Sequence, residues 1–242
     1  GSFIILGFAA AIVGPSLPHL AENTGTLINE ISALFLTRST GYFIGSWIAG
    51  HLYDRFAGHR VLSFGLILTI VMLILIPELS VLWLLTLVML MLGLAEGIID
   101  VGGNALLVWV HRDGVGPYIT ALHSFFGVGS FLAPIFIAQS LLMRGDIDLG
   151  YWLVAALIVP VVIWIGRLDS PVSPAKTHQR KSEGESSLRS PLIPILGTVL
   201  LLFLYVGVEM GFGGWVYTYA LEMGLANQSE AAYITSAYWG AF

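Results

Sequence analysis

The chain has 242 residues, of which 57% are hydrophobic and only 10% are charged, whereas roughly a quarter of the residues of an average soluble domain are charged. This composition excludes a water-soluble fold, and the formal net charge of -5 does not favour a nucleic-acid partner. The chain contains no cysteine, which excludes disulfides, thiolate metal sites and a thiol nucleophile.

Apolar stretches long enough to cross a bilayer follow one another along the chain. A spanning helix needs about 20 mostly apolar residues, because each residue advances it by about 1.5 Å across about 30 Å of hydrocarbon. We expect spans at about Ser2 to Leu17, Leu27 to Leu52, Val61 to Pro77, Val81 to Val110, Val115 to Met143, Leu149 to Arg167 and Leu192 to Leu221, with an eighth beginning near Ser229. The fold class predicted is therefore an all-α membrane protein.

The two ends of the sequence are unlike complete spans. The first stretch is short, has no methionine at its start, and is expected to break near its outer end at Gly14, Pro15 and Pro18. The eighth stretch is cut at Phe242. These features are typical of a fragment.

Basic residues lie almost entirely in the loops of one side. One set of alternate loops contains Arg55, Arg60, Arg112, Arg167, Lys176, Arg180, Lys181 and Arg189, and the other contains only Arg144. The positive-inside rule makes the first side cytoplasmic, in a protein expected to cross the cell membrane many times. A long polar segment follows the sixth span on that side. We therefore predict a six-helix bundle over 1–168, a cytoplasmic linker over 169–190, and the start of a second bundle, with its seventh helix and part of an eighth, over 191–242.

Two pairs of glycines are spaced by four inside the expected spans. Gly41 and Gly45 form one pair, and Gly93 and Gly97 form the other. Small residues at this spacing allow helix backbones to approach closely. They predict close helix packing.

The connection between the second and third spans carries Gly50, then Asp54 and Arg55, and finally Arg60. The glycine permits close helix contact, the aspartate can cap a helix or pair with a cation, and the basic residues anchor the loop at the membrane surface. Ordinary anchoring also accounts for the two arginines alone. The whole pattern resembles the signature loop of the major facilitator superfamily, although the second glycine of that pattern falls at Ala57.

This resemblance covers essentially the whole chain. It implies two six-helix bundles around a central cavity, with the solute near the bilayer midplane, and a transporter that works by alternating access. The present chain is then expected to supply the first bundle and the start of the second.

A charge inside a membrane span costs about 2.5 to 3.5 kcal/mol or more. The candidates away from the ends of the expected spans are Arg38, Glu96, Asp100, His123 and Glu209. At about 1.5 Å per residue, Arg38 and Glu96 lie at similar depths near the centre of the bilayer, so we expect them to form a pair.

Glu96, Asp100 and Asn104 are spaced by four and share one face of the fourth span. His123 lies near the depth of Asp100 and Asn104, so we expect these three to shape a polar pocket. A structural network that only locks the bundle is the alternative for the charged groups, and His123 alone could satisfy a backbone carbonyl.

The acid four residues before an asparagine, with the run from Ala121 to Pro134 in the fifth span, resembles the fucose permease and sodium-dependent glucose transporter group of the superfamily. In that group the acid is implicated in cation-coupled sugar uptake, which the resemblance carries onto Asp100 and Asn104. The first span here lacks the further carboxylate of fucose permease. Proton coupling through such a pair is therefore in question, and sodium coupling or facilitation stays open.

The seventh span places Tyr205, Glu209 and Phe212 on one face, followed by Trp215. An aromatic ring beside a carboxylate suits a sugar, which has apolar faces and hydroxyl edges. An aromatic run packed against lipid is the alternative for Trp215.

The predicted function is transport of a small polar solute, with a sugar as the expected class. The expected binding residues are Arg38, Glu96, Asp100, Asn104, His123, Glu209 and Trp215. No cofactor or metal is expected apart from H⁺ or Na⁺ as a coupling ion. A proton-driven drug or metabolite exporter is the nearest alternative, and a membrane-embedded enzyme is the more distant one, because the sequence shows no catalytic motif.

Overall fold

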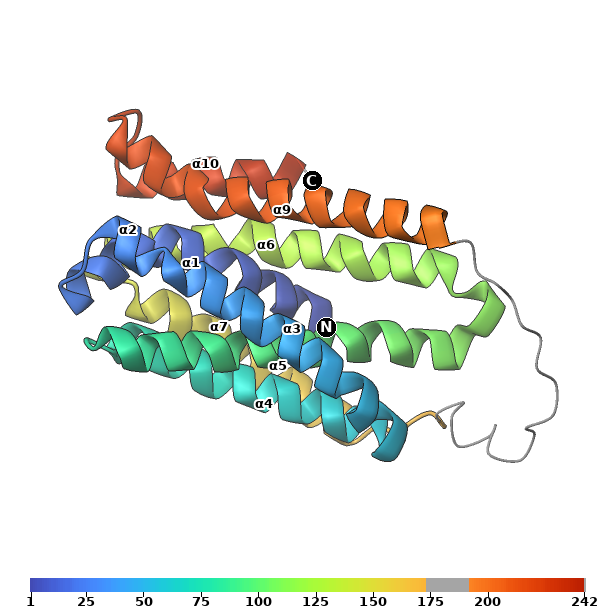
Figure 1. Cartoon of the computed structure of the whole chain (residues 1–242). Coiled ribbons are helices and arrows are strands. Elements are labelled where there is room, and N and C mark those ends of the chain that lie inside the picture. The colour runs from blue at the N-terminus through green and yellow to red at the C-terminus, as the bar shows by residue number, and fades with distance from the viewer. Residues whose placement is uncertain (173–191, 242) are drawn as a thin grey trace, which may run out of the picture.

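The structure, a computed structural model, describes residues 1–172 and 192–241, and these residues form long helices joined by short connections (Figure 1). The α-helices are α1 (Ser2–Thr24), α2 (Ile28–Ile31), α3 (Ala33–Arg55), α4 (Gly58–Leu75), α5 (Leu82–His111), α6 (Gly116–Arg144), α7 (Asp148–Gly166), α9 (Leu192–Glu222) and α10 (Gln228–Ala241). Short 3-10 turns follow α4 at Ile76–Glu78 and α5 at Arg112–Gly114. The predicted all-α fold is confirmed for the described part of the chain.

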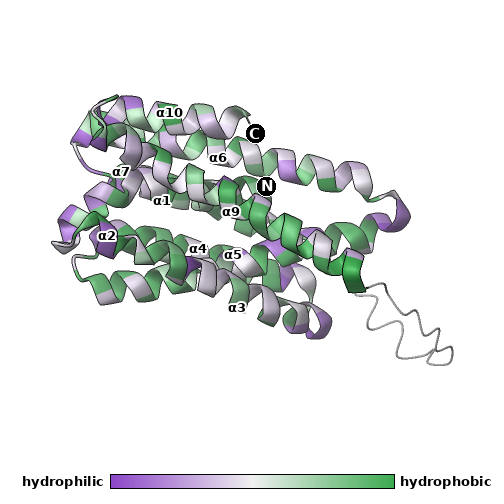
Figure 2. Cartoon of the chain, turned by 45° about the horizontal axis from the view of Figure 1, so that its top comes forward, coloured by the Kyte–Doolittle hydropathy of each residue, from purple (hydrophilic) through white to green (hydrophobic). Residues whose placement is uncertain are grey.

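Six helical segments of the described residues are long and apolar enough to cross a membrane. They are Ser2–Thr24, Gly58–Glu78, Leu82–Gly114, Gly116–Arg144, Asp148–Gly166 and Leu192–Glu222. Polar colour in Figure 2 gathers mainly at the helix ends, and hydrophobic colour covers most of the lengths between them. The expected second span is present as α3, but a run of polar residues from Thr37 to Thr40 lowers its hydropathy, and it is not among the six.

The expected break in the first helix is wrong. α1 continues through Pro15 and Pro18 to Thr24, where Gly25 adopts a left-handed backbone with φ of 63°. Each proline removes one helical hydrogen bond, which membrane helices tolerate when neighbouring helices surround them. α1 has this protection, because it is the most deeply buried of the six apolar segments and packs against α5, α6 and α9.

The two glycine pairs meet each other in the contact between α3 and α5, the most extensive in the described structure. A Cβ added at Gly41 would strike the carbonyl oxygen of Leu90, and one at Gly93 would strike that of Arg38. A Cβ at Gly45 or Gly97 would likewise meet main-chain oxygen of the opposite helix. We call these four glycines the glycine seam. Their predicted role in close packing is confirmed.

α9 and α10 contact the first helices over one half of the molecule only. Near its outer-loop end α9 crosses α1, where a Cβ at Gly14 would lie 2.9 Å from the carbonyl oxygen of Gly214. α10 packs along α6. The first half of α9 is exposed on all sides, and an apolar helix of that kind is stable only in hydrocarbon or under further protein.

The domain division at residues 168 and 190 is not tested by these features. The predicted linker over 169–190 lies largely outside the described residues, and so do Lys176, Arg180, Lys181 and Arg189.

Candidate functional site

The predicted pair of Arg38 and Glu96 is present in the contact between α3 and α5. Arg38 donates from Nε to Glu96 Oε2 at 2.9 Å and from Nη2 to Oε1 at 2.8 Å. Two parallel bonds from one guanidinium to one carboxylate are a strong, oriented form of ion pair. Glu96 is only 2% exposed, so the pair lies inside the protein.

Arg38 also reaches a third helix. Its Nη1 donates to the carbonyl oxygen of Ala10 in α1 at 3.3 Å. One side chain of α3 therefore holds both α5 and α1 by hydrogen bonds. Since arginine does not give up its proton in proteins, it acts here as a fixed positive charge.

Asp100 lies one helical turn beyond Glu96 on α5 and has a partner on each carboxylate oxygen. Tyr42 of α3 donates from Oη to Asp100 Oδ2. Asn104 donates from Nδ2 to Asp100 Oδ1 at 3.1 Å and to the Asp100 carbonyl at 3.0 Å. Asp100 and Asn104 are half-buried, so the expected stripe on α5 stays partly accessible next to the buried pair.

The tyrosine at position 42 is the main residue that sequence reasoning missed. A usable signal was present, because Arg38 and Tyr42 are spaced by four on α3 as Glu96 and Asp100 are on α5. Because the glycine seam holds α3 and α5 in close contact, the polar residues on successive turns of α3 lie against those on successive turns of α5. The first turn pairs arginine with glutamate, and the second pairs tyrosine with aspartate.

His123 does not join this group. Its ring packs edge-on against Phe3 of α1, with ring centroids 5.6 Å apart, and the described structure contains no hydrogen bond from His123 to Asp100 or Asn104. The reason lies in the packing order: α6 packs mainly on α1, and the Phe3 ring also touches α5 at Gly103. Of the three residues predicted to shape a polar pocket, Asp100 and Asn104 are joined by a hydrogen bond, and the place of His123 in the pocket stays a prediction.

Glu209 and Trp215 of α9 lie apart from the ion pair. The Trp215 ring packs at a tilt against Phe35 of α3, with centroids 5.9 Å apart, one turn before Arg38. Glu209 is half-buried, and its main-chain carbonyl accepts a hydrogen bond of 2.9 Å from Tyr238 of α10. Trp215 thus belongs to the contact between α9 and α3, and Glu209 belongs to the contact between α9 and α10.

The loop residues Asp54, Arg55 and Arg60 are exposed, and no hydrogen bond or ion pair of their side chains occurs within the described residues. The expected close helix contact at Gly50 is wrong there, because a Cβ at Gly50 would meet no atom within 4 Å. Gly58 makes the close contact instead, since its Cβ would lie 2.6 Å from Leu106 of α5.

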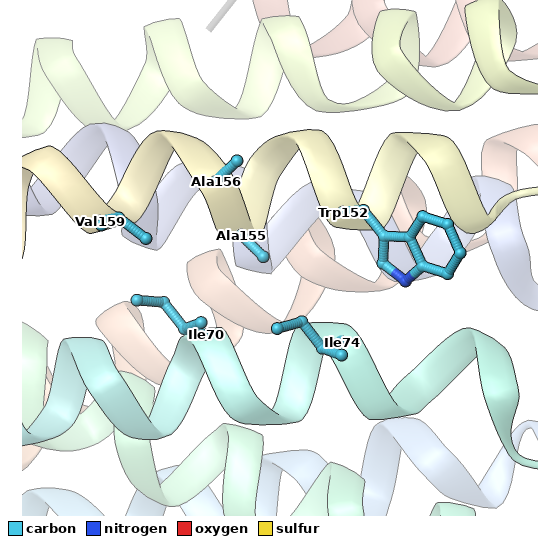
Figure 3. A pocket seen from close by; sticks show the side chains of 6 residues that line it. All are labelled: Ile70, Ile74, Trp152, Ala155, Ala156 and Val159. Atoms are coloured by element: carbon cyan, nitrogen blue, oxygen red, sulfur yellow. The ribbon is translucent and has the colours of Figure 1, made fainter.

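Two grooves of the described surface lie elsewhere. One, of about 370 Å³, runs between α4 and α7, and Figure 3 shows Ile70 and Ile74 facing α7 across it, with Trp152 at one end. It has only apolar lining and faces outward, which suits lipid rather than a polar solute. The other, of about 600 Å³, lies beside the loop between α9 and α10 and is lined by Leu142, Asn227, Gln228, Ser229, Glu230 and Tyr233.

Comparisons with known proteins agree with this architecture. The sodium-dependent glucose transporter 1 of Xenopus laevis is 31% identical over 260 residues, which cover 97% of this chain and 53% of that protein. The human protein of the same name is 30% identical over 277 residues, covering 100% of this chain and 53% of the relative. Bypass of stop codon protein 6 of Saccharomyces cerevisiae is 25% identical over 272 residues, covering 98% and 52%. The chain spans about half the length of these curated relatives.

The family model described as Major Facilitator Superfamily matches residues 1–242, the whole of the chain. That match agrees with the long apolar helices, the loop pattern between α3 and α4, and the relatives that share the full length of this sequence. This chain therefore belongs to the Major Facilitator Superfamily.

Proposed function

We propose that this chain is part of a secondary transporter that moves a small polar solute, with a sugar as the solute class, by alternating access. The relatives named as sodium-dependent glucose transporters support the solute class. The half-buried Asp100 and Asn104, one turn beyond the buried ion pair, supply the oriented donors and acceptors that a hydroxyl-rich solute needs within a membrane. Because the chain spans about half of those relatives, the second half of the cavity comes from residues beyond it.

The observation that carries the proposal is the charge balance of this group. Arg38 supplies one positive charge, and Glu96 and Asp100 supply two negative charges within one turn. Glu96 is neutralised by its bidentate pair, whereas the described partners of Asp100, Tyr42 and Asn104, are uncharged. An uncompensated carboxylate inside a membrane is costly, so one monovalent cation, H⁺ or Na⁺, is the natural counter-charge.

Cation binding at Asp100 also provides a coupling mechanism. A cavity that closes around a free carboxylate must desolvate it, and this penalty falls when a cation is bound. A cation therefore favours closed states of the cavity relative to open ones, and the size of the shift is its difference in affinity for the two states. Glu96 does not take part in this cation binding, because the fixed positive charge of Arg38 already neutralises it.

The test is counterflow of labelled D-glucose in proteoliposomes made from the full-length protein, with sodium and proton gradients imposed separately. Asp100→Asn keeps the shape of the side chain and removes the charge, so we expect cation-driven uptake to fall at least tenfold. Asp113→Asn is the control, because Asp113 is an exposed aspartate in the turn after α5. Unchanged cation-driven uptake in Asp100→Asn would show that the coupling group lies elsewhere, and export of apolar drugs without hexose transport would favour an exporter.

We also propose the domain division at residues 168 and 190 and a cytoplasmic position for the linker. The excess of Arg and Lys in the loops on that side supports the orientation. The cell membrane is the proposed location.

A further inference from the structure

Two tyrosines of α3 donate hydrogen bonds to α5, and they differ in what they hold. Tyr53 is 2% exposed and donates to the main-chain carbonyl of Ile98 at 3.1 Å. Tyr42 is 37% exposed and donates to the carboxylate of Asp100. The first bond joins two helices inside the core, whereas the second fixes an ionisable side chain at an accessible surface.

The position of Tyr42 is set by the glycine seam. A Cβ at Gly93 would lie 2.9 Å from the main-chain nitrogen of Tyr42, and one at Gly97 would strike its carbonyl oxygen. The main chain of Tyr42 therefore lies directly against α5. Arg38, one turn earlier, is held by its two bonds to Glu96, so the register of α3 against α5 is fixed on both sides of this turn.

The two hydrogen bonds orient the Asp100 carboxylate but leave some of its acceptor sites unoccupied. A carboxylate has about four acceptor sites, two on each oxygen. Tyr42 uses one on Oδ2 and Asn104 uses one on Oδ1. Acceptor capacity remains on both oxygens for a cation or a solute hydroxyl, while the two donors restrain the rotation of the group.

We propose that Tyr42 is a positioning residue for Asp100, which orients the carboxylate toward its cation and solute and so sets the affinity of the site. This inference rests on the proposed transport function and assigns a role to a residue that neither the loop pattern nor the stripe on α5 contains. An unrestrained Asp100 would have to lose its side-chain freedom on each binding event, and that loss lowers affinity.

The experiment compares Tyr42→Phe with Tyr53→Phe in the full-length protein, because each variant removes one hydroxyl from the same helix. The measured quantities are the KM and maximal rate of D-glucose uptake, the half-saturating sodium concentration, and the unfolding temperature in detergent. For Tyr42→Phe we expect KM or half-saturation to rise about tenfold, as befits a lost bond to a charged group, with little change in unfolding temperature. For Tyr53→Phe we expect a lower unfolding temperature and unchanged affinities.

Equal effects of the two substitutions on affinity, or no effect of Tyr42→Phe, would overturn the positioning role. A wild-type protein that transports no hexose would refute the proposed function separately. The inference would then be decided by the rise in unfolding temperature when choline chloride is replaced by sodium chloride. That rise is expected in the wild type and in Tyr53→Phe and is expected to be smaller in Tyr42→Phe; a rise of the same size in Tyr42→Phe, or none in the wild type, overturns it.

Discussion

At the scale of single residues, the contact between Arg38 and Glu96 joins α3 to α5 through a buried ion pair. A buried ion pair adds little net stability over a well-packed apolar pair, but removal of one partner leaves an unpaired charge and costs about 3–5 kcal/mol. The bond from Arg38 to Ala10 ties the same charge to α1, so loss of the pair affects three helices.

This arrangement predicts a strongly non-additive result for substitutions of the pair. Glu96→Leu should lower the unfolding free energy by about 3–5 kcal/mol, because it leaves Arg38 without its carboxylate. The double variant Arg38→Met, Glu96→Leu should recover more than half of that loss. Thermal unfolding of the purified full-length protein measures both, with Glu78→Gln as an exposed control. A double variant that transports normally would show that the pair only locks the bundle.

At the scale of elements, the glycine seam decides how α3 and α5 meet. Backbone contact brings Arg38 and Tyr42 within reach of Glu96 and Asp100, and any larger residue would separate the helices. In the polar stretch of α3, α5 supplies the carboxylate partner of Arg38, and the hydroxyls of Thr37 and Thr40 donate to carbonyls of α3 itself. The site is therefore a property of the helix pair and not of either helix alone.

Replacing Gly93 or Gly127 by alanine should distinguish the effect of helix packing on stability from the effect of helix propensity. In Gly93→Ala the new Cβ falls on the carbonyl oxygen of Arg38, so we expect a loss of about 1–3 kcal/mol as the helices move apart. In Gly127→Ala of α6 the new Cβ meets no atom within 4 Å, and stability should change by less than about 1 kcal/mol. Denaturation of both variants in detergent gives the comparison. Equal losses at the two sites would contradict the role of the seam.

At the scale of the whole molecule, contact between the first helices and α9 and α10 is confined to one half. Gly14 meets Gly214 and Phe35 meets Trp215 there, while the first half of α9 is exposed. The described helices therefore pack together near the α9–α10 loop, whereas the first half of α9 has an exposed surface.

The orientation of the molecule predicts which loops a reagent can reach. Single cysteines at Ser182, in the proposed cytoplasmic linker, and at Asn227, in the loop before α10, would be introduced into a cysteine-free full-length protein. A membrane-impermeant maleimide on intact cells should label Asn227→Cys and leave Ser182→Cys unlabelled until the cells are opened. The reverse pattern would invert the topology.

Length, hydropathy and residue spacing by themselves determined the fold class, the order of the helices, the close packing of the two glycine pairs and the pairing of Arg38 with Glu96. Each of these features depends either on a single helix or on two residues lying at the same depth in the membrane, and that depth can be estimated by counting residues along each span. The tertiary structure alone decided the partner of Asp100, the packing of His123 against Phe3, and the continuation of α1 through its prolines. Each of these depends on which helix faces which, and that is settled by side-chain packing between segments far apart in the chain.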